Sequence, residues 1–577
     1  MAAIDRPLDY LVPDDLDGRV EVGTLVRVPL HGRRVRGWVV ARASHPETDH
    51  PLQRVAKVTG LGPSPDIVEL ADWAAWRWAG PRVAFLRAAS PPRAVRDLPT
   101  QSSPAGRGPG CNAPTGGEGR ASVVSDAFSG GPAVVRLPPA DDPFPVVAEG
   151  ARRADALVLA PSVAGAAYLA ARLRRAGHAV ALLPDDWPQA AAGGCIAVGA
   201  RGAAWAPRPK LGAVVVVDEH DPAYQEERAP TWHARDVVVE RARRVGAPCV
   251  LTSPCPSLET LATTRVVTLA RADERAGWPV VEVVDRRREE PGKGLFSDRL
   301  VALARQAGEG QRVVCVLNRK GRARLLACTA CGELARCEAC GAVVEEEDGS
   351  LRCRRCAAVR PLVCAACGST GLKVLRMGVT RAREHLERLV GRPVAEITAD
   401  AGGIPADASV LVGTEAVLHR VARAWLVAFL DLDQELLVPR YRAGEEAFGL
   451  VARAARVVGG RADGGRLLVQ TRLPGSEVVD AAVHADPSRL AVVEMARRAA
   501  FGLPPERAVA ALSGEGADAF ARAVGAEPGV EVVGPMKGRW LVRAADHPTL
   551  CDALAAARRR RSRGEGRLRL SVDPLEL

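Results

Sequence analysis

Residues 328–367 read CTACGELARCEACGAVVEEEDGSLRCRRCAAVRPLVCAAC and hold eight of the chain's 14 cysteines. The eight form four Cys-x2-Cys pairs: Cys328/Cys331, Cys337/Cys340, Cys353/Cys356 and Cys364/Cys367. A tight turn with this spacing brings two thiolates to one ion, and two such turns supply the closed tetrahedral sulfur shell of structural zinc. The stretch therefore predicts two Zn²⁺ ions per chain.

Two other uses of these cysteines remain open. The first is a set of disulfides, although the pairing is very regular and nothing else in the chain resembles a secreted protein. The second is an Fe–S cluster, which also takes four thiolates. The segment has little apolar material for a core of its own. We therefore expect metal binding to drive its folding, with about 10–16 kcal/mol per structural site.

Length and charge set the broad class of the protein. A chain of 577 residues is too long for one hydrophobic core, so we expect about three to five domains. The net charge of +11 favours a polyanionic partner such as nucleic acid. The N-terminal residues MAAIDRPLDYLVPDD lack the apolar core of a signal peptide, and no apolar run approaches membrane-spanning length. We expect a cytoplasmic protein with no membrane partner.

The N-terminal third divides into three predicted segments. Residues 8–58 alternate as strands around a turn at HGRR, which predicts a small β domain over residues 1–62. Residues 63–98 begin a helix at Ser64-Pro65-Asp66 and carry Trp73, Trp76 and Trp78, which we expect to pack against a neighbouring domain. Residues 99–131 are rich in Gly, Ser and Pro without periodicity, which predicts a disordered linker.

The remainder predicts a multidomain α/β protein. Short Val-rich runs alternate with amphipathic helices over residues 132–275, and again over 276–327 and 373–474 on either side of the cysteine segment 328–372. Such patterns are typical of parallel sheets covered on both faces. Residues 475–577 suggest a compact α+β domain. Its last helix ends in a basic run, Arg558 to Arg561, which either suits a helix C-terminus or contacts DNA.

One strand of the first α/β segment ends in acidic residues. The run GAVVVVDEHD places Asp218, Glu219 and His220 at a strand carboxyl end, where parallel sheets bind ligands. P-loop ATPases hold the magnesium ion of ATP with acidic residues at such a strand end.

Several segments together resemble the PriA family of replication restart proteins, which are built on superfamily 2 helicase lobes. The similar stretches are LDYLVP and VGTLVRVPL near the N-terminus, AVGARGAAWAPRPKLGAVVVVDEHDPAYQEE, WHARDV and TSPCPSLET in the first lobe, VLNRKGRARLLACTACGELARCEAC and FLDLDQELLVPRYRAGEEAF in the second, and VDPLEL at the end. The eight cysteines following a strand that ends in NRKG carry most of the specificity.

The resemblance implies a fold and a set of site residues. It implies two RecA-like lobes with a double zinc insert, and an N-terminal domain that binds DNA 3′ ends, with Asp9 accepting from a terminal 3′-hydroxyl beside Tyr10. It also pairs the cysteines: the outer four (Cys328, Cys331, Cys364, Cys367) share one zinc, and the inner four (Cys337, Cys340, Cys353, Cys356) share the other. The implied partners are forked or single-strand-containing DNA and other primosome proteins.

The region where the family holds ATP phosphates departs from the family pattern. A Gly-rich loop ending in Gly-Lys-Thr is expected before the first helix of the first lobe, but this chain has AVVRLPPADDPFPVVAEGARR. Asp141 and Asp142 would repel a triphosphate, and the prolines remove amide donors or distort the turn.

Three further ATPase elements are altered. The Asp-Glu-Glu-His box is shortened to Asp218-Glu219-His220, and the Ser-Ala-Thr box reads Ser253-Pro254-Cys255. In the arginine motif, ARAARVVGGRAD, Val457 and Gly460 occupy the arginine positions, with Arg456 and Arg461 one residue away. All four ATPase elements are altered together. We therefore predict that Asp218-Glu219-His220 is only a remnant of the box, that no catalytic residue remains, and that ATP is not a working cofactor.

Three hypotheses follow from the sequence. The first is a replication restart protein that binds stalled or branched forks and recruits replication proteins without ATPase activity. The second is an ATP-dependent 3′-to-5′ DNA helicase with an unconventional nucleotide site. The third is a zinc-stabilised scaffold that binds proteins and not DNA. Steep salt dependence of DNA binding separates the first from the third, because phosphate contacts release counterions.

Overall fold

The computed structural model describes residues 6–45, 48, 50–100, 118–289, 294–317, 325–353, 356–374, 379–397, 403–405, 408–438, 440–561, 564 and 566–576. The chain forms two compact units. The first unit combines Met1–Arg136, Asp142–Thr268 and Arg498–Pro574, and the second combines Leu137–Asp141, Leu269–Arg497 and Leu575–Leu577.

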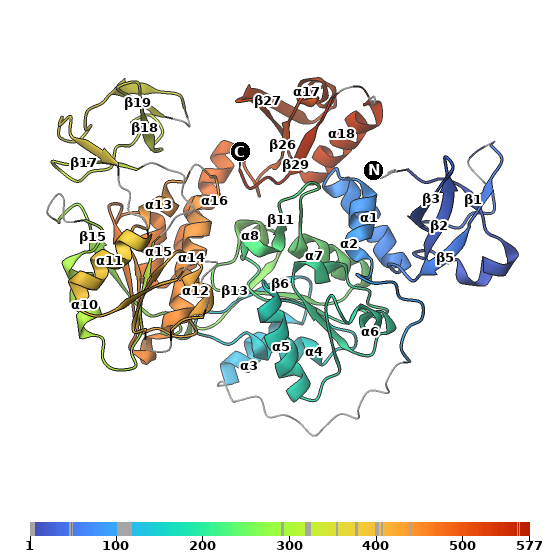
Figure 1. Cartoon of the computed structure of the whole chain (residues 1–577), viewed down its shortest axis with the longest axis horizontal. Helices are drawn as coiled ribbons and strands as arrows, with labels where there is room; N and C mark the ends of the chain where they lie inside the picture. Colours follow the sequence, from blue (N-terminus) through green and yellow to red (C-terminus); the bar gives the residue numbers. More distant parts are fainter. Residues whose placement is uncertain are drawn as a thin grey trace. The chain divides into compact units, whose positions relative to one another are not determined.

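The first unit begins with a small β domain, as the alternation in residues 8–58 predicts (Figure 1). Its sheet has the antiparallel order β3-β2-β5, and a short parallel pair joins β1 to β4. The strand bounds are β1 Tyr10–Leu11, β2 Leu25–Leu30, β3 Arg33–Trp38, β4 Gln53–Arg54 and β5 Lys57–Gly60. The hairpin turn is confirmed at His31-Gly32, where both residues have positive φ, the geometry that a two-residue hairpin loop requires.

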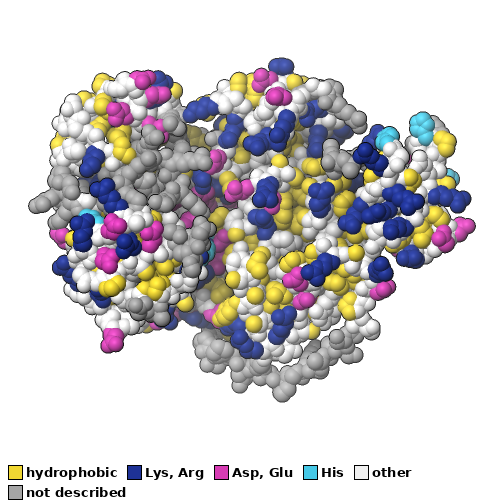
Figure 2. Space-filling model, in the orientation of Figure 1, with side chains coloured by type: hydrophobic (Ala, Val, Ile, Leu, Met, Phe, Trp, Pro, Cys, Tyr) yellow, Lys and Arg dark blue, Asp and Glu magenta, His cyan; other side chains and the backbone are white. Residues whose placement is uncertain are grey.

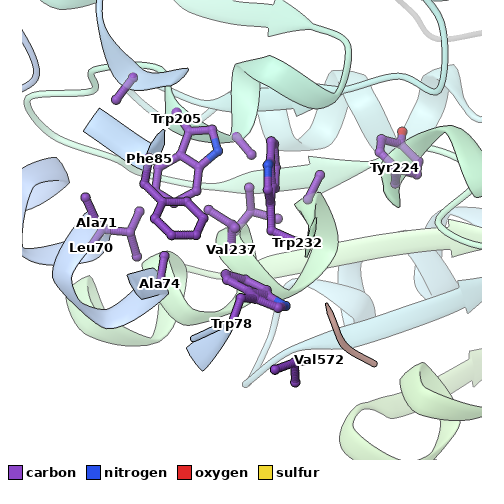
Figure 3. Packing of buried hydrophobic residues seen from close by; sticks show 14 of the residues in the cluster. Leu70, Ala71, Ala74, Trp78, Phe85, Trp205, Tyr224, Trp232, Val237 and Val572 are labelled. Atoms are coloured by element: carbon purple, nitrogen blue, oxygen red, sulfur yellow. The ribbon is translucent and has the colours of Figure 1, made fainter. Parts of the chain in front are cut away.

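Two helices, α1 (Pro65–Arg77) and α2 (Arg82–Ala89), follow the β domain. Residues 61–100 contain no strand, so this segment is a helical pair and not a complete winged helix. Trp73 and Trp78 pack as predicted, in a series with Phe85, Trp205 and Trp232 whose successive ring centroids are 5.3–6.1 Å apart. The Trp76 indole N–H instead donates to Asp552 of the C-terminal domain at 2.8 Å. Figure 3 shows Trp78, Phe85, Trp205 and Trp232, which join α1 and α2 to the first lobe.

The predicted linker is shorter than expected at its C-terminal end. Helix α3 (Glu118–Ala127) occupies part of the segment assigned to the linker. Its last residue, Ala127, is fully buried and is followed by Phe128, which is also buried. Residues 101–117, the Gly- and Pro-rich part of the predicted linker, lie outside the described residues.

The first lobe is a seven-stranded, fully parallel sheet in the order β14-β6-β13-β10-β7-β9-β8. The strands are β6 Ala133–Arg136, β7 Leu157–Leu159, β8 Val180–Leu182, β9 Ile196–Gly199, β10 Val214–Val216, β13 Cys249–Ser253 and β14 Arg265–Thr268. The helices are α4 Phe144–Ala151, α5 Val163–Arg175, α6 Trp187–Ala192, α7 Ala234–Val245 and α8 Leu258–Thr263. The sequence pattern missed only β14, an edge strand whose residues are mostly exposed.

The C-terminal domain packs onto the same core. Its antiparallel sheet has the order β27-β28-β26-β29, with β26 Ala508–Ser513, β27 Val530–Met536, β28 Arg539–Ala544 and β29 Arg569–Val572, and it carries helices α17 Ala517–Gly525 and α18 His547–Arg560. Buried residues of α18 and β29, such as Leu554 and Val572, belong to one hydrophobic cluster with α1 and the first lobe.

The second unit contains a six-stranded parallel sheet in the order β15-β25-β24-β16-β23-β22. The strands are β15 Val280–Asp285, β16 Val313–Val316, β22 Val394–Ile397, β23 Val410–Gly413, β24 Leu426–Phe429 and β25 Arg466–Thr471. The helices are α9 Arg271–Ala276, α10 Asp298–Gln306, α11 Val379–Val390, α12 Val417–Arg420, α13 Asp433–Leu436, α14 Ala443–Val458, α15 Glu477–His484 and α16 Pro487–Phe501.

The predicted start of the C-terminal domain at residue 475 is too early. Helix α15 packs against α14 and β15 of the second lobe. The compact α+β sheet begins only with β26 at Ala508. The sequence of an amphipathic helix shows that one face is apolar but not which core that face covers. The apolar face of α15 covers the second lobe. Among the described residues, no helix is long and apolar enough to cross a membrane.

Candidate functional site

The four Cys-x2-Cys pairs adopt one repeated turn. In each, the backbone N–H of the residue after the second cysteine donates to the carbonyl of the first, at 2.8–3.0 Å. The donors are Gly332, Gly341, Ala357 and Gly368, and all four have φ between 61° and 75°. Three of the four are glycine, the residue that adopts this left-handed conformation at no steric cost.

The turns bring the cysteines together in two groups. Cys328, Cys331, Cys364 and Cys367 form the outer group, and Cys337, Cys340, Cys353 and Cys356 form the inner group. Within each group all sulfur atoms lie within 4.8 Å of one another, and the closest pairs are 3.5–3.6 Å apart. A disulfide would need about 2.05 Å. Tetrahedral Zn–S bonds of about 2.3 Å place sulfurs about 3.8 Å apart. Both groups can hold a metal ion.

The cysteine insert has small sheets and a small core. Strands β17 (Leu326–Cys328) and β21 (Leu372–Val374) pair, and β18 (Val344–Glu347), β19 (Ser350–Cys353) and β20 (Val359–Pro361) form a second sheet. Among the described residues of the insert, this buried apolar cluster consists of Leu326, Ala335, Val344 and Leu351 with two of the cysteines. So few apolar residues provide little stability without the metal centres.

The insert is anchored on the second lobe. Leu325, Ala327 and Leu334 pack against Leu437 and Leu473 of the lobe. The Arg472 Nε–H, directly after β25, donates to the Gly332 carbonyl at 3.1 Å. The turn that carries Cys331 is therefore held at the carboxyl end of a central strand of the lobe.

Ala357 is the one non-glycine residue among the four turn positions, at φ 61°. We expect Ala357→Gly to relieve the left-handed strain and stabilise the inner site by about 1 kcal/mol. Competition with a chelator should then show a roughly fivefold higher metal affinity for this site. Gly341→Ala is the reciprocal control: a Cβ there would meet no atom within 4 Å, so only backbone strain is added. Equal affinities in both variants would contradict the prediction.

The segment after β6, where the family pattern has a phosphate-binding loop, offers no free amide at the start of α4. Pro143 and Pro145 have no N–H. The Phe144 N–H donates to Asp142 Oδ1 at 3.0 Å, and the N–H groups of Val146 and Val147 donate to the Pro143 carbonyl at 3.1 and 3.2 Å. Since anions bind helix N-termini through free N–H groups, this terminus is closed to a phosphate.

The carboxylate of Asp142 also forms an ion pair with Arg172. Both guanidinium NH groups of Arg172 donate to its carboxylate, at 2.8 and 2.6 Å, and the guanidinium lies 3.9 Å from the centroid of the Phe144 ring. This hydrogen bond raises the pKa of Arg172, although burial opposes it. Arg172 thus fixes the loop conformation.

Glu219 is completely buried and fully hydrogen-bonded. Its Oε1 accepts from the Ser257 N–H at 2.7 Å. Its Oε2 accepts from the Thr260 hydroxyl at 2.7 Å, the Ser257 hydroxyl at 2.9 Å and the Arg235 guanidinium at 3.3 Å. The side chain has no exposed surface. A general base must reach the water that it activates, and this carboxylate is directed into the lobe interior instead.

The other remnant residues lie close by. Asp218 has a left-handed φ of 53°, and its N–H donates to Thr252 Oγ1 at 3.3 Å. His220 Nδ1 and Ser253 Oγ are 2.8 Å apart, so the altered boxes at the ends of β10 and β13 still contact each other.

A chain of buried charges extends from Glu219 to the C-terminal domain. Arg235 bonds Asp236 at 2.8 Å, and Arg77 of α1 lies 3.8 Å from Asp236 and 2.7 Å from Asp573. Burial raises the pKa of Asp573, but Arg77 and His547 outweigh it and hold this pKa well below its usual range. Through these contacts Glu219 is connected to α1 and β29.

The altered arginine motif also has a structural use. Arg456 Nε–H donates to the Pro139 carbonyl at 3.2 Å. Gly460 N–H donates to Asp463 at 2.8 Å, in the short 3₁₀ turn Arg461–Asp463. Asp431 and Asp433 follow β24; burial and the Asp433 carboxylate raise the pKa of Asp431 to about 7, and Asp433 accepts from the Arg472 N–H at 2.8 Å.

Asp9 and Tyr10 lie at the start of the N-terminal domain, where both are partly buried. The Tyr10 hydroxyl donates to the Pro29 carbonyl of β2 at 2.9 Å. Burial raises the pKa of Tyr10. Tyr10 therefore fixes β1 against β2.

Comparison with known proteins places these features in one family. The profile described as 3'DNA-binding domain (3'BD) of PriA matches residues 1–91. A Mycobacterium leprae protein described as a probable replication restart protein PriA is 31% identical over 565 residues, covering 89% of this chain and 86% of that protein. The chain belongs to the PriA family. A replication restart protein PriA of Treponema pallidum is 30% identical over 336 residues, covering 54% of this chain and 50% of that protein.

The two parallel sheets are the two α/β lobes that the sequence of this PriA family member predicts. Among solved structures, a DEAD box protein of Methanococcus jannaschii covers 65% of this chain and 89% of its own, with 10% identity and a TM-score of 0.32. The matched 3′ DNA-binding profile spans the β domain and continues through α1 and α2.

Sequence reasoning did not identify the partners of Glu219. Arg235, Ser257 and Thr260 all lie in the PriA-like segments WHARDV and TSPCPSLET. The only indication in the sequence was that all three residues lie in segments that resemble the PriA family. Their convergence on one carboxylate requires the tertiary arrangement of β10, α7 and α8.

Proposed function

We propose that this chain is a cytoplasmic replication restart protein that binds stalled or branched replication forks and recruits replication proteins without hydrolysing ATP. Its PriA relatives, the match to the 3′ DNA-binding profile and the net charge of +11 support the DNA-binding role. In this proposal Asp9 accepts from the 3′-hydroxyl of the nascent strand, and affinity comes mainly from phosphate contacts.

One observation carries the non-hydrolysing part of the proposal: the N-terminus of α4 has no free amide for a phosphate. Prolines remove two donors, and the other three amides are bonded within the turn. The buried state of Glu219 supports the same conclusion, since this carboxylate is not accessible to a water that it would activate.

The proposal includes two structural Zn²⁺ ions, one in the outer and one in the inner cysteine group. Four thiolates in a closed shell are the ligand set of structural zinc, which contributes folding energy and no chemistry. Sulfur atoms within 4.8 Å of one another suit a single ion. A cluster of several irons with bridging sulfides would spread the same ligands further apart.

The proposed domains follow from this assignment. They are residues 1–62 for 3′-end binding, 63–98 for the helical remnant, 99–131 for the linker as modified by α3, 132–275 for the first lobe, 276–327 with 373–474 for the second, and 328–372 for the zinc insert. The C-terminal domain begins after α15, which belongs to the second lobe, and its sheet begins at Ala508.

The test is ATP turnover by the purified, zinc-replete chain with and without forked DNA, together with fork binding across a salt series. We expect fork binding whose affinity falls steeply with salt, and no DNA-stimulated hydrolysis. DNA-dependent turnover would overturn the non-hydrolysing part and favour a helicase with an unconventional site. Absence of salt-dependent DNA binding would overturn the fork-binding part and favour a protein scaffold.

A further inference from the structure

Three adjacent strands of the N-terminal sheet carry a row of cations. In the β2–β3 register Arg27 lies opposite Arg36, and in the β2–β5 register Arg27 lies opposite Lys57. Directly opposite residues have Cβ atoms about 4.5–5.5 Å apart, so Arg36, Arg27 and Lys57 form a continuous line across the sheet. We call these three residues the cation row.

The cation row occupies the face opposite the domain core. Val26, Val28 and Val35 point into the core of the β domain, and the residues that alternate with them point the other way. Arg27, Arg36 and Lys57 are all exposed. At one end of this face, Leu25 is buried and the Trp38 indole N–H donates to Ser90 Oγ at 2.8 Å, so that end packs on the residue after α2. The cation row lies on the uncovered part.

The row has no acidic partner in the part of the N-terminal domain that the structure describes. Among the described residues, Arg27, Arg36 and Lys57 form no ion pair. Arg42 of the same domain, in contrast, contacts both Asp17 and Glu21. Like charges directly opposite each other destabilise a sheet. An arrangement that is unfavourable in the free protein becomes favourable when an anionic partner lies across all three strands.

Further cations surround the row. Arg33, Arg34 and Arg54 are exposed, and Arg34 is two residues from Arg36 on the same face of β3. Figure 2 shows Lys and Arg side chains gathered over this domain. The cation row itself contains no aromatic side chain. Proteins that bind single strands stack bases on aromatic side chains, whereas a flat array of cations matches a duplex phosphate backbone.

We propose that the cation row binds the phosphate backbone of a duplex arm of the fork. The inference rests on the proposed fork binding and goes beyond it, because it assigns duplex contacts to a surface distinct from the pairing of Asp9 with a 3′-hydroxyl. The row supplies affinity and orientation, and the contacts carry no sequence information.

The test compares salt dependence of binding for wild type, Arg27→Gln and Arg42→Gln, with a blunt duplex, a fork with a nascent 3′-hydroxyl, and oligo-dT as probes. Each lost phosphate contact should reduce the slope of log affinity against log salt by about 0.9 for duplex DNA. We expect this reduction for Arg27→Gln on the duplex and the fork. Arg42→Gln removes the same formal charge from a residue already paired with two carboxylates, so its slope should match that of wild type.

Charge reversal separates binding from folding. Arg27→Glu places a carboxylate between Arg36 and Lys57, which creates two opposite-charge cross-strand pairs. Its melting temperature should be equal to or above that of wild type, while its duplex affinity falls further than that of Arg27→Gln. Loss of stability together with loss of binding would assign the row a structural role and overturn the inference.

The outcomes also distinguish this inference from the proposed function. Wild type that fails to bind the fork overturns the proposed function. Wild type that binds with an unchanged slope in Arg27→Gln overturns only the cation row. An Arg27→Gln defect confined to oligo-dT would assign the row to single strands and likewise overturn the duplex assignment.

Discussion

Replacing Cys353 by serine is expected to lower the metal content from two ions per chain to one and to unfold the inner part of the insert. Cys353 ends β19 and belongs to the inner cysteine group. A structural site contributes about 10–16 kcal/mol to folding, and the few apolar residues of the insert core cannot replace that contribution. Elemental analysis measures the metal, and limited proteolysis within residues 341–361 reports the unfolding.

Cys255→Ser is the matched control. Cys255 is a partly buried cysteine of the first lobe that belongs to neither metal group, so its variant should retain both ions. Loss of both ions in Cys353→Ser would mean that the two sites fold as one unit. Retention of both ions would contradict the assignment of the inner site. Visible absorption bands in the wild type would identify iron and refute zinc.

Replacing Glu219 by glutamine is expected to destabilise the first unit by about 3 kcal/mol, the lower end of the cost of breaking a buried ion pair. Both carboxylate oxygens accept hydrogen bonds: one from the Ser257 N–H and the other from Thr260, Ser257 and Arg235. A glutamine amide can be placed in two orientations. In one its NH₂ group would face the Ser257 N–H, and in the other it would face the Arg235 guanidinium, so a donor would meet a donor in both. The variant would also remove one of the two carboxylates that pair with Arg235.

Thermal melting and ATP turnover measured together separate the structural role from a catalytic one. We expect a lower melting temperature in Glu219→Gln and no DNA-stimulated turnover in either protein. Glu226→Gln is the control, because its pair with Arg201 is partly exposed and should contribute less than about 1 kcal/mol. A stable Glu219→Gln variant that loses a turnover present in wild type would restore Glu219 as a catalytic residue.

The segments that correspond to altered ATPase elements form specific contacts within this protein. Asp142 bonds Arg172, Glu219 bonds Arg235, and Arg456 bonds the Pro139 carbonyl. In an active helicase, these regions must bind and release nucleotide. Here these polar groups pair within the protein: the Glu219–Arg235 pair is buried, and the Asp142–Arg172 pair is partly exposed.

Local sequence patterns predicted those features that depend on interactions between residues close together in the chain. The cysteine spacing determined the four turns, because each turn forms within five residues and its last position favours glycine. The Val-rich runs predicted eleven of the parallel strands, since buried strands require continuous apolar segments. The edge strands β14 and β15 were missed because exposed edges do not require such runs.

Only the tertiary structure decided which groups meet. Grouping the cysteines as outer and inner sets depends on how β17 pairs with β21, which spacing alone leaves open. The burial of Glu219, its link through Arg235 and Arg77 to Asp573, and the assignment of α15 to the second lobe all depend on contacts between residues far apart in the chain. The cation row depends on strand register, because a shift by one residue would direct every side chain to the other face.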